Sequence, residues 1–131
     1  MSSTDGGLPD HDPELLERQF ESLRRSFYQN IGPDVRRLGE LARQYALVSG
    51  NEPQPSAATG FENDIAAIAH RIRGAAAIFG DASISTNAAE LERIVGGAIT
   101  ARSHSMDTSV TILRSIDNLI EVLARCRADF A

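Results

Sequence analysis

The sequence contains three histidines and one cysteine, side chains that can act as nucleophiles and as metal ligands near neutral pH: His11, His70, His104 and Cys126. A neutral imidazole, whose ordinary pKa is about 6.5, is a competent nucleophile and also a metal ligand. His11 and His104 lie in polar, loop-like segments without a partner at ligand spacing, so we expect no metal site. Cys126 lies among apolar residues, which favours a packed side chain. His70 is therefore the candidate for chemistry.

His70 belongs to the most clearly periodic segment of the chain. The apolar residues of that segment recur in steps of three and four, at Phe61, Ile65, Ile68, Ala69, Ile72, Ala76 and Phe79. On a helical wheel of about 100° per residue, His70 lies roughly 150° from this stripe, so its imidazole is expected to face solvent. The residues one and two turns away on the same side are small, and they predict a docking surface: Asn63, Ala66, Ala67, Gly74 and Ala77.

Two arginines accompany the histidine. Arg73 is one turn further along the helix, and Arg71 borders the other flank. A guanidinium is always charged and its N–H donors suit phosphate oxygens, so Arg73 is the candidate for binding an anion attached to His70. Gly74 costs about 1 kcal/mol relative to alanine inside a helix, which calls for a reason such as close approach of another molecule.

The elements that position these residues are all expected to be helices. Residues 1–12 are polar and acidic and are expected to be a flexible lead-in, whereas residues 13–131 form one helical domain. Asp12 is expected to cap a first helix that starts at Pro13 and ends at the Gly32–Pro33 pair. This pair is interpreted as a corner, after which a second helix runs from Pro33 to about Val48.

The remaining boundaries come from caps and turn residues. They predict a loop over Ser49–Gly60, a third helix over Phe61–Phe79 stopped by Gly80, a fourth helix capped by Asp81 or Ser83 and ending near Arg102, and a last helix capped by Asp107 or Thr108. Apolar stripes at helical spacing are predicted on the first helix, at Phe20, Leu23, Phe27 and Ile31, and on the fourth, at Ile84, Ala88, Leu91, Val95 and Ala98. Four phenylalanines are expected in the core, at Phe20, Phe27, Phe61 and Phe79. The fold class predicted is all-α, an antiparallel up-and-down four-helix bundle with an additional N-terminal helix.

Composition narrows the classes of function. The formal net charge is −5, which disfavours nucleic-acid binding. No apolar run is long enough to cross a bilayer, no secretory signal is recognisable, and a single cysteine excludes an internal disulfide. We therefore expect a cytoplasmic protein without membrane contact. Because a bundle that buries its apolar stripes internally has none left for a second copy, we expect a monomer.

The run HRIRGAAAIFGDASISTNAAELE, residues 70–92, resembles the signature of histidine phosphotransfer (HPt) domains of bacterial two-component phosphorelays. The residues that carry the resemblance are His70, Ile72, Arg73, Gly74, Ala76 and Gly80, followed by Ile84, Ala88, Leu91 and Glu92. Two positions depart from the pattern, since Arg73 stands where the family often has lysine and Ile84 where leucine is common. The first departure keeps the charge and changes the geometry of phosphate contact.

The resemblance implies that His70 receives a phosphoryl group from an aspartyl phosphate of one response-regulator receiver domain and passes it to the aspartate of another. Receivers, including that of a hybrid histidine kinase, are the implied partners. They would supply Mg²⁺, so this chain needs no cofactor and acts as a phosphocarrier rather than an enzyme. Arg73 and Gly74 would accommodate the phosphoryl group, while Asn63, Ala66, Ala67, Arg71 and Ala77 would contact the receiver.

Two alternatives remain at this stage. One is the dimerisation module of a sensor histidine kinase, which also displays a histidine on a helical bundle. There an acidic residue typically follows the histidine, whereas Arg71 follows it here, and the chain has no ATP-binding domain. The other is a helical adaptor that binds receivers or other proteins without being phosphorylated.

Overall fold

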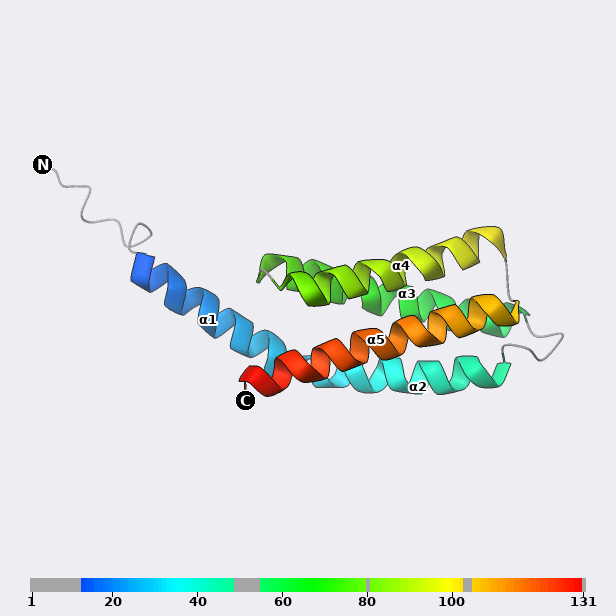
Figure 1. The fold of residues 1–131 in the computed structure, drawn as a ribbon, viewed down its shortest axis with the longest axis horizontal. Helices are drawn as coiled ribbons and strands as arrows, with labels where there is room; N and C mark the ends of the chain where they lie inside the picture. The colour runs from blue at the N-terminus through cyan, green and yellow to red at the C-terminus, as the bar shows by residue number, and fades with distance from the viewer. Residues whose placement is uncertain (1–12, 49–54, 80, 103–104, 131) are drawn as a thin grey trace, which may run out of the picture.

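The computed structural model describes residues 13–48, 55–79, 81–102 and 105–130. Within these ranges the chain forms helices and contains no strand, which confirms the all-α prediction. The helices are α1 (Pro13–Asn30), α2 (Gly32–Val48), α3 (Pro55–Ile78), α4 (Ala82–Ala101) and α5 (Met106–Phe130) (Figure 1).

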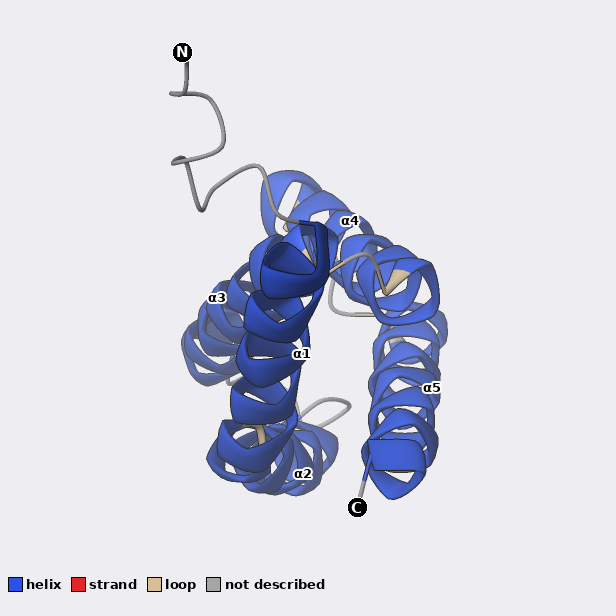
Figure 2. Ribbon diagram, turned by 90° about the vertical axis from the view of Figure 1, so that its left-hand side faces the viewer, coloured by secondary structure: helices blue, strands red, loops and turns tan. Residues whose placement is uncertain are grey.

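Helices α2 to α5 form an antiparallel bundle in which each packs against two neighbours. Helix α3 lies between α2 and α4, and α5 closes the ring between α4 and α2, as the end-on view shows (Figure 2). Helix α1 lies outside this ring at one end of the bundle. The outer surface of α3 is therefore flanked by α2 and α4 only, which leaves room for a partner.

The bundle core is made of the apolar stripes of its four helices. On α3 the buried stripe comprises Ile65, Ile68, Ala69, Ile72 and Ala76, and on α4 it comprises Ile84, Ala88, Leu91, Val95 and Ala98. Each buried leucine or isoleucine contributes roughly 1.5–3 kcal/mol through removal of its side chain from water. Packing of these two stripes holds α3 and α4 in a fixed rotation about their axes, and this rotation sets which residues of α3 face outward.

A buried polar pair links α2 to α3. The hydroxyl of Tyr45 donates a 2.7 Å hydrogen bond to Oε2 of Glu62, and both side chains are fully buried. Burial raises the pKa of Tyr45 well above its ordinary value, and the neighbouring Glu62 carboxylate acts in the same direction, so the phenol stays protonated and remains a donor. A buried carboxylate is costly without such donors.

Replacing Tyr45 by phenylalanine is expected to destabilise the protein by roughly 1–3 kcal/mol, because Glu62 then loses a buried donor. Urea unfolding followed by circular dichroism measures this as a lower midpoint with an unchanged m value. The double variant Tyr45→Phe/Glu62→Leu is expected to lose less stability than the two single variants lose together, because it leaves neither buried polar group without its partner. Equal stability of Tyr45→Phe and the wild type would contradict this role for the pair.

Helix α3 begins earlier than predicted. The predicted loop over Ser49–Gly60 is wrong from Pro55 onward, because α3 starts there. Proline is tolerated in the first turn of a helix, and Ala58 is buried in the core, so docking against the bundle stabilises this turn. The rest of the predicted loop, residues 49–54, lies outside the described residues.

The caps of α4 and α5 differ in how well the sequence predicted them. Asp81 caps α4 as predicted, since its side chain accepts a 3.2 Å hydrogen bond from the backbone N–H of Ile84. For α5 the predicted caps Asp107 and Thr108 are wrong. The helix starts at Met106, and the hydroxyl of Ser105 accepts a 3.2 Å bond from the N–H of Thr108. The proposed stop at Gly80 and cap at Asp12 lie outside the described residues.

Helix α1 contacts the bundle near its C-terminal end. Tyr28 is buried and its hydroxyl donates to Asp81, while the ring of Phe27 packs against that of Phe79 with centroids 5.5 Å apart. The helix ends at Asn30, and Ile31 separates it from α2, so the two helices are distinct as predicted, but the break precedes the Gly32–Pro33 pair, which belongs to the first turn of α2. These contacts attach the last turn of α1 to the turn between α3 and α4.

The prediction that Phe20 lies in the core is wrong, and Leu23, which belongs to the same apolar stripe, is exposed as well. These residues are 50% and 52% exposed, because α1 extends past the end of the bundle and meets no other described element there (Figure 1). Phe27, Phe61 and Phe79 are half-buried. Phe27 and Phe61 pack against the core, and Phe79 packs against Phe27. Helical spacing identified the apolar face of α1, whereas its exposure follows from the direction in which α1 leaves the bundle.

Candidate functional site

His70 lies on the outer face of α3, between the edges formed by α2 and α4. Its side chain is 66% exposed, so a partner molecule can reach the imidazole. The neighbouring residue Ile72 is buried in the core, and this packing holds the helix with His70 outward. The site is therefore open rather than enclosed in a pocket.

The imidazole is held by a carboxylate from α4. Nδ1 of His70 lies 2.7 Å from Oε2 of Glu92. An ionised carboxylate can only accept a hydrogen bond, so this short contact favours the tautomer in which Nδ1 carries the proton and donates it. In that tautomer of the neutral ring the lone pair resides on Nε2, the atom further from Glu92. The contact orients the ring and favours this tautomer.

Arg73 completes a cluster of three side chains. Its Nε donates a 2.7 Å hydrogen bond to Oε1 of Glu92, and its Nη2 lies 3.1 Å from Nδ1 of His70. With Nδ1 protonated, Nη2 of Arg73 cannot donate to that atom, and the guanidinium is held beside the ring by its bond to Glu92. Burial acts to raise the pKa of Glu92, but the hydrogen bonds from Arg73 and His70 outweigh it, and the pKa is lowered.

Acidification is expected to weaken this cluster. Because the pKa of Glu92 is lowered by folding, its contribution to stability is complete above its ordinary value of 4.5 and is lost as the pH falls through the lower folded value. Stability measured by urea unfolding between about pH 6 and pH 3 should therefore fall more steeply for the wild type than for Glu92→Gln. Parallel curves for the two proteins would show that Glu92 is not coupled to folding.

The small residues around His70 form the surface that the sequence predicted as a docking area. Asn63, Ala67, Gly74 and Ala77 are exposed, whereas Ala66 is half-buried and packs against the core. A Cβ added at Gly74 would meet no atom within 4 Å. Packing against the described residues therefore gives no reason for glycine at this position.

Arg71 is held away from the Glu92 cluster. Its Nη2 forms a 2.6 Å ion pair with Oδ1 of Asp34 at the start of α2. Arg71 therefore lies on the α2 side of α3, while Arg73 lies on the α4 side. The exposed pair contributes little to stability, so a partner can compete for Arg71 at low cost.

Two residues that shape the site were not predicted from the sequence, Glu92 and Asp34. Glu92 belongs to the motif of residues 70–92, but its contact with His70 depends on how α4 packs against α3. The sequence did contain a signal for Glu92. Leu91 belongs to the predicted apolar stripe of α4, so Glu92, the next residue, is expected at the edge of the interface that this stripe forms. No comparable signal exists for Asp34, which lies far from Arg71 in the chain.

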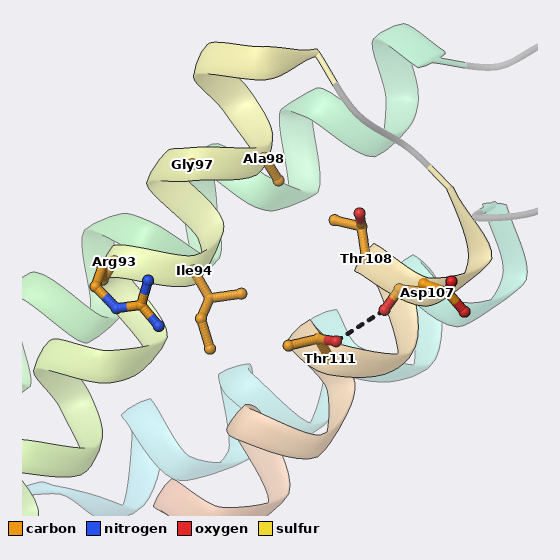
Figure 3. Close-up of a pocket in the computed structure, with 7 residues that line it drawn as sticks. All are labelled: Arg93, Ile94, Gly97, Ala98, Asp107, Thr108 and Thr111. Atoms are coloured by element: carbon orange, nitrogen blue, oxygen red, sulfur yellow. Dashed lines mark hydrogen bonds between the residues drawn. The ribbon is translucent and has the colours of Figure 1, made fainter.

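A separate groove lies on the other side of α4, facing α5. It has a volume of about 420 Å³ and is lined by residues including Arg93, Ile94, Gly97, Asp107 and Thr111 (Figure 3). The hydroxyl of Thr111 is bonded to the backbone carbonyl of Asp107, and Arg93 pairs with Glu90. The groove is lined by no histidine or cysteine, and His70 is not among its lining residues.

Other kinds of site are not found in the part of the chain that the structure describes. Among these residues no group of three or more histidine, cysteine or acidic side chains is arranged to hold a metal ion. None of the described helices is long and apolar enough to cross a membrane.

The fold and the site together define a class of protein, a helical bundle that displays a hydrogen-bonded, exposed histidine on its outer face. The family model described as Hpt domain matches residues 14–126, so the chain belongs to the Hpt domain family. Domains of this family carry out histidine phosphotransfer in two-component systems and interact with response-regulator receiver domains. Comparison with curated proteins gave no match, and neither did comparison with solved structures.

Proposed function

We propose that this protein shuttles a phosphoryl group between the aspartates of response-regulator receiver domains, and that Nε2 of His70 carries it. The observation that supports this role is the exposed imidazole whose Nδ1 is held by Glu92, because this arrangement directs the nucleophilic lone pair outward. An Hpt domain needs only this nucleophile and a surface, since the partner brings the activated phosphate.

In the proposed transfer, the lone pair of Nε2 attacks the phosphorus of the receiver's aspartyl phosphate. The N–P bond forms, the P–O bond to the aspartate breaks, and the aspartate leaves as a carboxylate. No proton has to move, because Nδ1 keeps its hydrogen and the phosphorylated ring becomes cationic. Glu92 lies 2.7 Å from Nδ1 and stabilises that positive charge. Transfer to the second receiver reverses these steps.

The neighbouring residues have distinct roles in this proposal. Arg73 contacts both Glu92 and His70, and its remaining N–H donors serve the phosphate oxygens once the ring is phosphorylated. Gly74 leaves space for the phosphoryl group one turn from His70. The receiver supplies Mg²⁺ and most of the charge stabilisation, so the chain needs no cofactor of its own and works as a carrier rather than an enzyme.

The receiver docks on the outer face of α3. The small side chains of Asn63, Ala66, Ala67 and Ala77 allow close approach, and Arg71 lies at the border toward α2. One of the two receivers in the relay belongs to a hybrid histidine kinase in this proposal, and the exchange takes place in the cytoplasm.

The experiment that tests the proposal mixes the purified full chain with receiver domains labelled by a small phosphodonor. Transfer is expected to produce a phosphate on this chain that is stable in alkali and labile in acid, as a phosphohistidine is. Addition of a second, unlabelled receiver should then remove the label from the chain. If no receiver labels the chain while the same receivers label another Hpt domain, the carrier function is wrong and a role as an unphosphorylated adaptor takes its place.

A further inference from the structure

The apolar face of α1 is a surface that the proposed phosphotransfer does not use. Leu16, Phe20 and Leu23 are 41%, 50% and 52% exposed, although each is an apolar side chain on the same face of one helix. Figures 1 and 2 show that α1 leaves the end of the bundle, so no other described element covers this face. The expectation of a monomer assumed that every apolar stripe is buried internally, and α1 does not meet that condition.

The stripe has the spacing of a two-helix seam. Leu16, Phe20, Leu23 and Phe27 are separated by four, three and four residues, the alternation by which a helix meets a second helix along its length. A helix of this length is only marginally stable in water unless its apolar face is packed. Because α1 is packed only near its C-terminal end, a second helix along this seam would supply the missing contacts.

The charges of α1 indicate what that second helix is. Its N-terminal half carries Glu14, Glu17 and Glu21 with one opposing Arg18, whereas its C-terminal half carries Arg24 and Arg25. Two copies of α1 side by side in parallel would place like charges together, while an antiparallel pair places each acidic half against a basic half. We propose that two copies of this protein associate through an antiparallel pairing of their α1 helices.

The register of the pair follows from the same residues. A twofold axis midway between Phe20 and Leu23 packs each Phe20 against Leu23 of the second copy, and each Leu16 against Phe27. Glu17 and Arg24 follow Leu16 and Leu23 directly and share one flank of the seam, so Glu17 faces Arg24 of the second copy. Arg24, whose side chain is 37% exposed, lies 3.5 Å from Glu21 of its own helix, and a pair of this kind near the surface contributes little to stability.

This pairing leaves both phosphotransfer sites accessible. The two bundles are attached to the C-terminal ends of their α1 helices, so in an antiparallel pair they lie at opposite ends. His70 is on α3 rather than on α1, and each copy can therefore receive a receiver domain of its own. The inference does not depend on whether His70 is phosphorylated.

Sedimentation equilibrium of the full chain tests the proposal. The wild type is expected to form a dimer that dissociates on dilution, and Phe20→Glu is expected to weaken it by roughly a hundredfold by placing a charge in the apolar seam. Glu17→Arg and Arg24→Glu should each weaken it by roughly tenfold, because both copies of the contact become repulsive. Arg25→Glu is the matched control, since it makes the same charge change on the face opposite the seam and should leave the dimer unchanged.

The register has its own readout. An equal mixture of Glu17→Arg and Arg24→Glu should form a heterodimer of wild-type strength, because each arginine then meets a glutamate, and the double variant Glu17→Arg/Arg24→Glu should dimerise again. Circular dichroism of each variant verifies that the bundle is folded. A wild type that stays monomeric at every concentration overturns the proposal, and so does a dimer that survives Phe20→Glu or is not restored by mixing. A monomeric wild type whose Phe20→Glu variant loses phosphotransfer would instead assign this face to the receiver.

Discussion

Replacing His70 by glutamine is expected to abolish phosphorylation of the protein. Glutamine keeps a polar side chain on the exposed face of α3 but has no nucleophilic nitrogen, so the receiver's aspartyl phosphate finds no acceptor. Removal of a nucleophile should lower the rate of phosphotransfer by roughly a thousandfold or more, so no label should be detectable on the variant. The measurement is transfer of label from a charged receiver, followed by separation of the two proteins.

Controls for His70→Gln come from the rest of the chain. His11→Gln and His104→Gln make the same chemical change at residues that the sequence places outside the site, and both should accept label at the wild-type rate. Circular dichroism should give the same helix content for all variants, because the His70 side chain is mostly outside the core. Normal labelling of His70→Gln would place the phosphate on another residue.

Replacing Gly74 by phenylalanine is expected to slow phosphotransfer by roughly a hundredfold while the fold is retained. A misplacement of about 1 Å between reacting groups can cost that much in rate, and a ring one turn from His70 would hold the receiver away from the imidazole. The fold should tolerate the change, since a Cβ at this position meets no atom within 4 Å. Stopped-flow or quench-flow transfer from a charged receiver measures the rate.

Two variants make this prediction specific. Gly74→Ala should raise the stability by about 0.5–1 kcal/mol, because glycine in a helix interior is unfavourable and the added methyl group has space. Gly60→Phe is the matched control, since Gly60 lies on the same helix α3, is exposed, and likewise has no atom within 4 Å of an added Cβ. Equal transfer rates for Gly74→Phe and Gly60→Phe would remove the argument that Gly74 serves close approach.

Much of the bundle was predictable because burial leaves a periodic trace in the sequence. The stripes of α3 and α4 were identified from their spacing, and their residues are buried in the structure. The same periodicity predicted that His70 points away from the core, because residues on the side of a helix opposite its buried stripe face solvent. The start of α3 at Pro55 was missed, because Pro, Ser, Ala and Gly suit a loop as well as the first turns of a helix, and only docking of Ala58 decides between them.

The side-chain contacts between different helices could not be predicted from the sequence. Glu92 approaches His70 because α4 packs antiparallel to α3 at one particular register, and Arg71 meets Asp34 because α2 lies on the other side. Each of these partners is distant in the chain, so local spacing carries no information about which pairs meet. The tautomer of His70, and with it the direction of its lone pair, is a property of the tertiary structure.

Helix α1 shows where the division between sequence and structure lies. Spacing alone predicted an amphipathic helix whose apolar face carries Phe20 and Leu23, because periodicity reports that a face is apolar. Whether such a face is covered by the same chain depends on the direction in which the helix leaves the corner at Ile31, and here that direction leaves Phe20 and Leu23 exposed. The pattern of residues thus showed which helix faces are apolar, and the packing of the helices determined which of these faces are buried within the described chain.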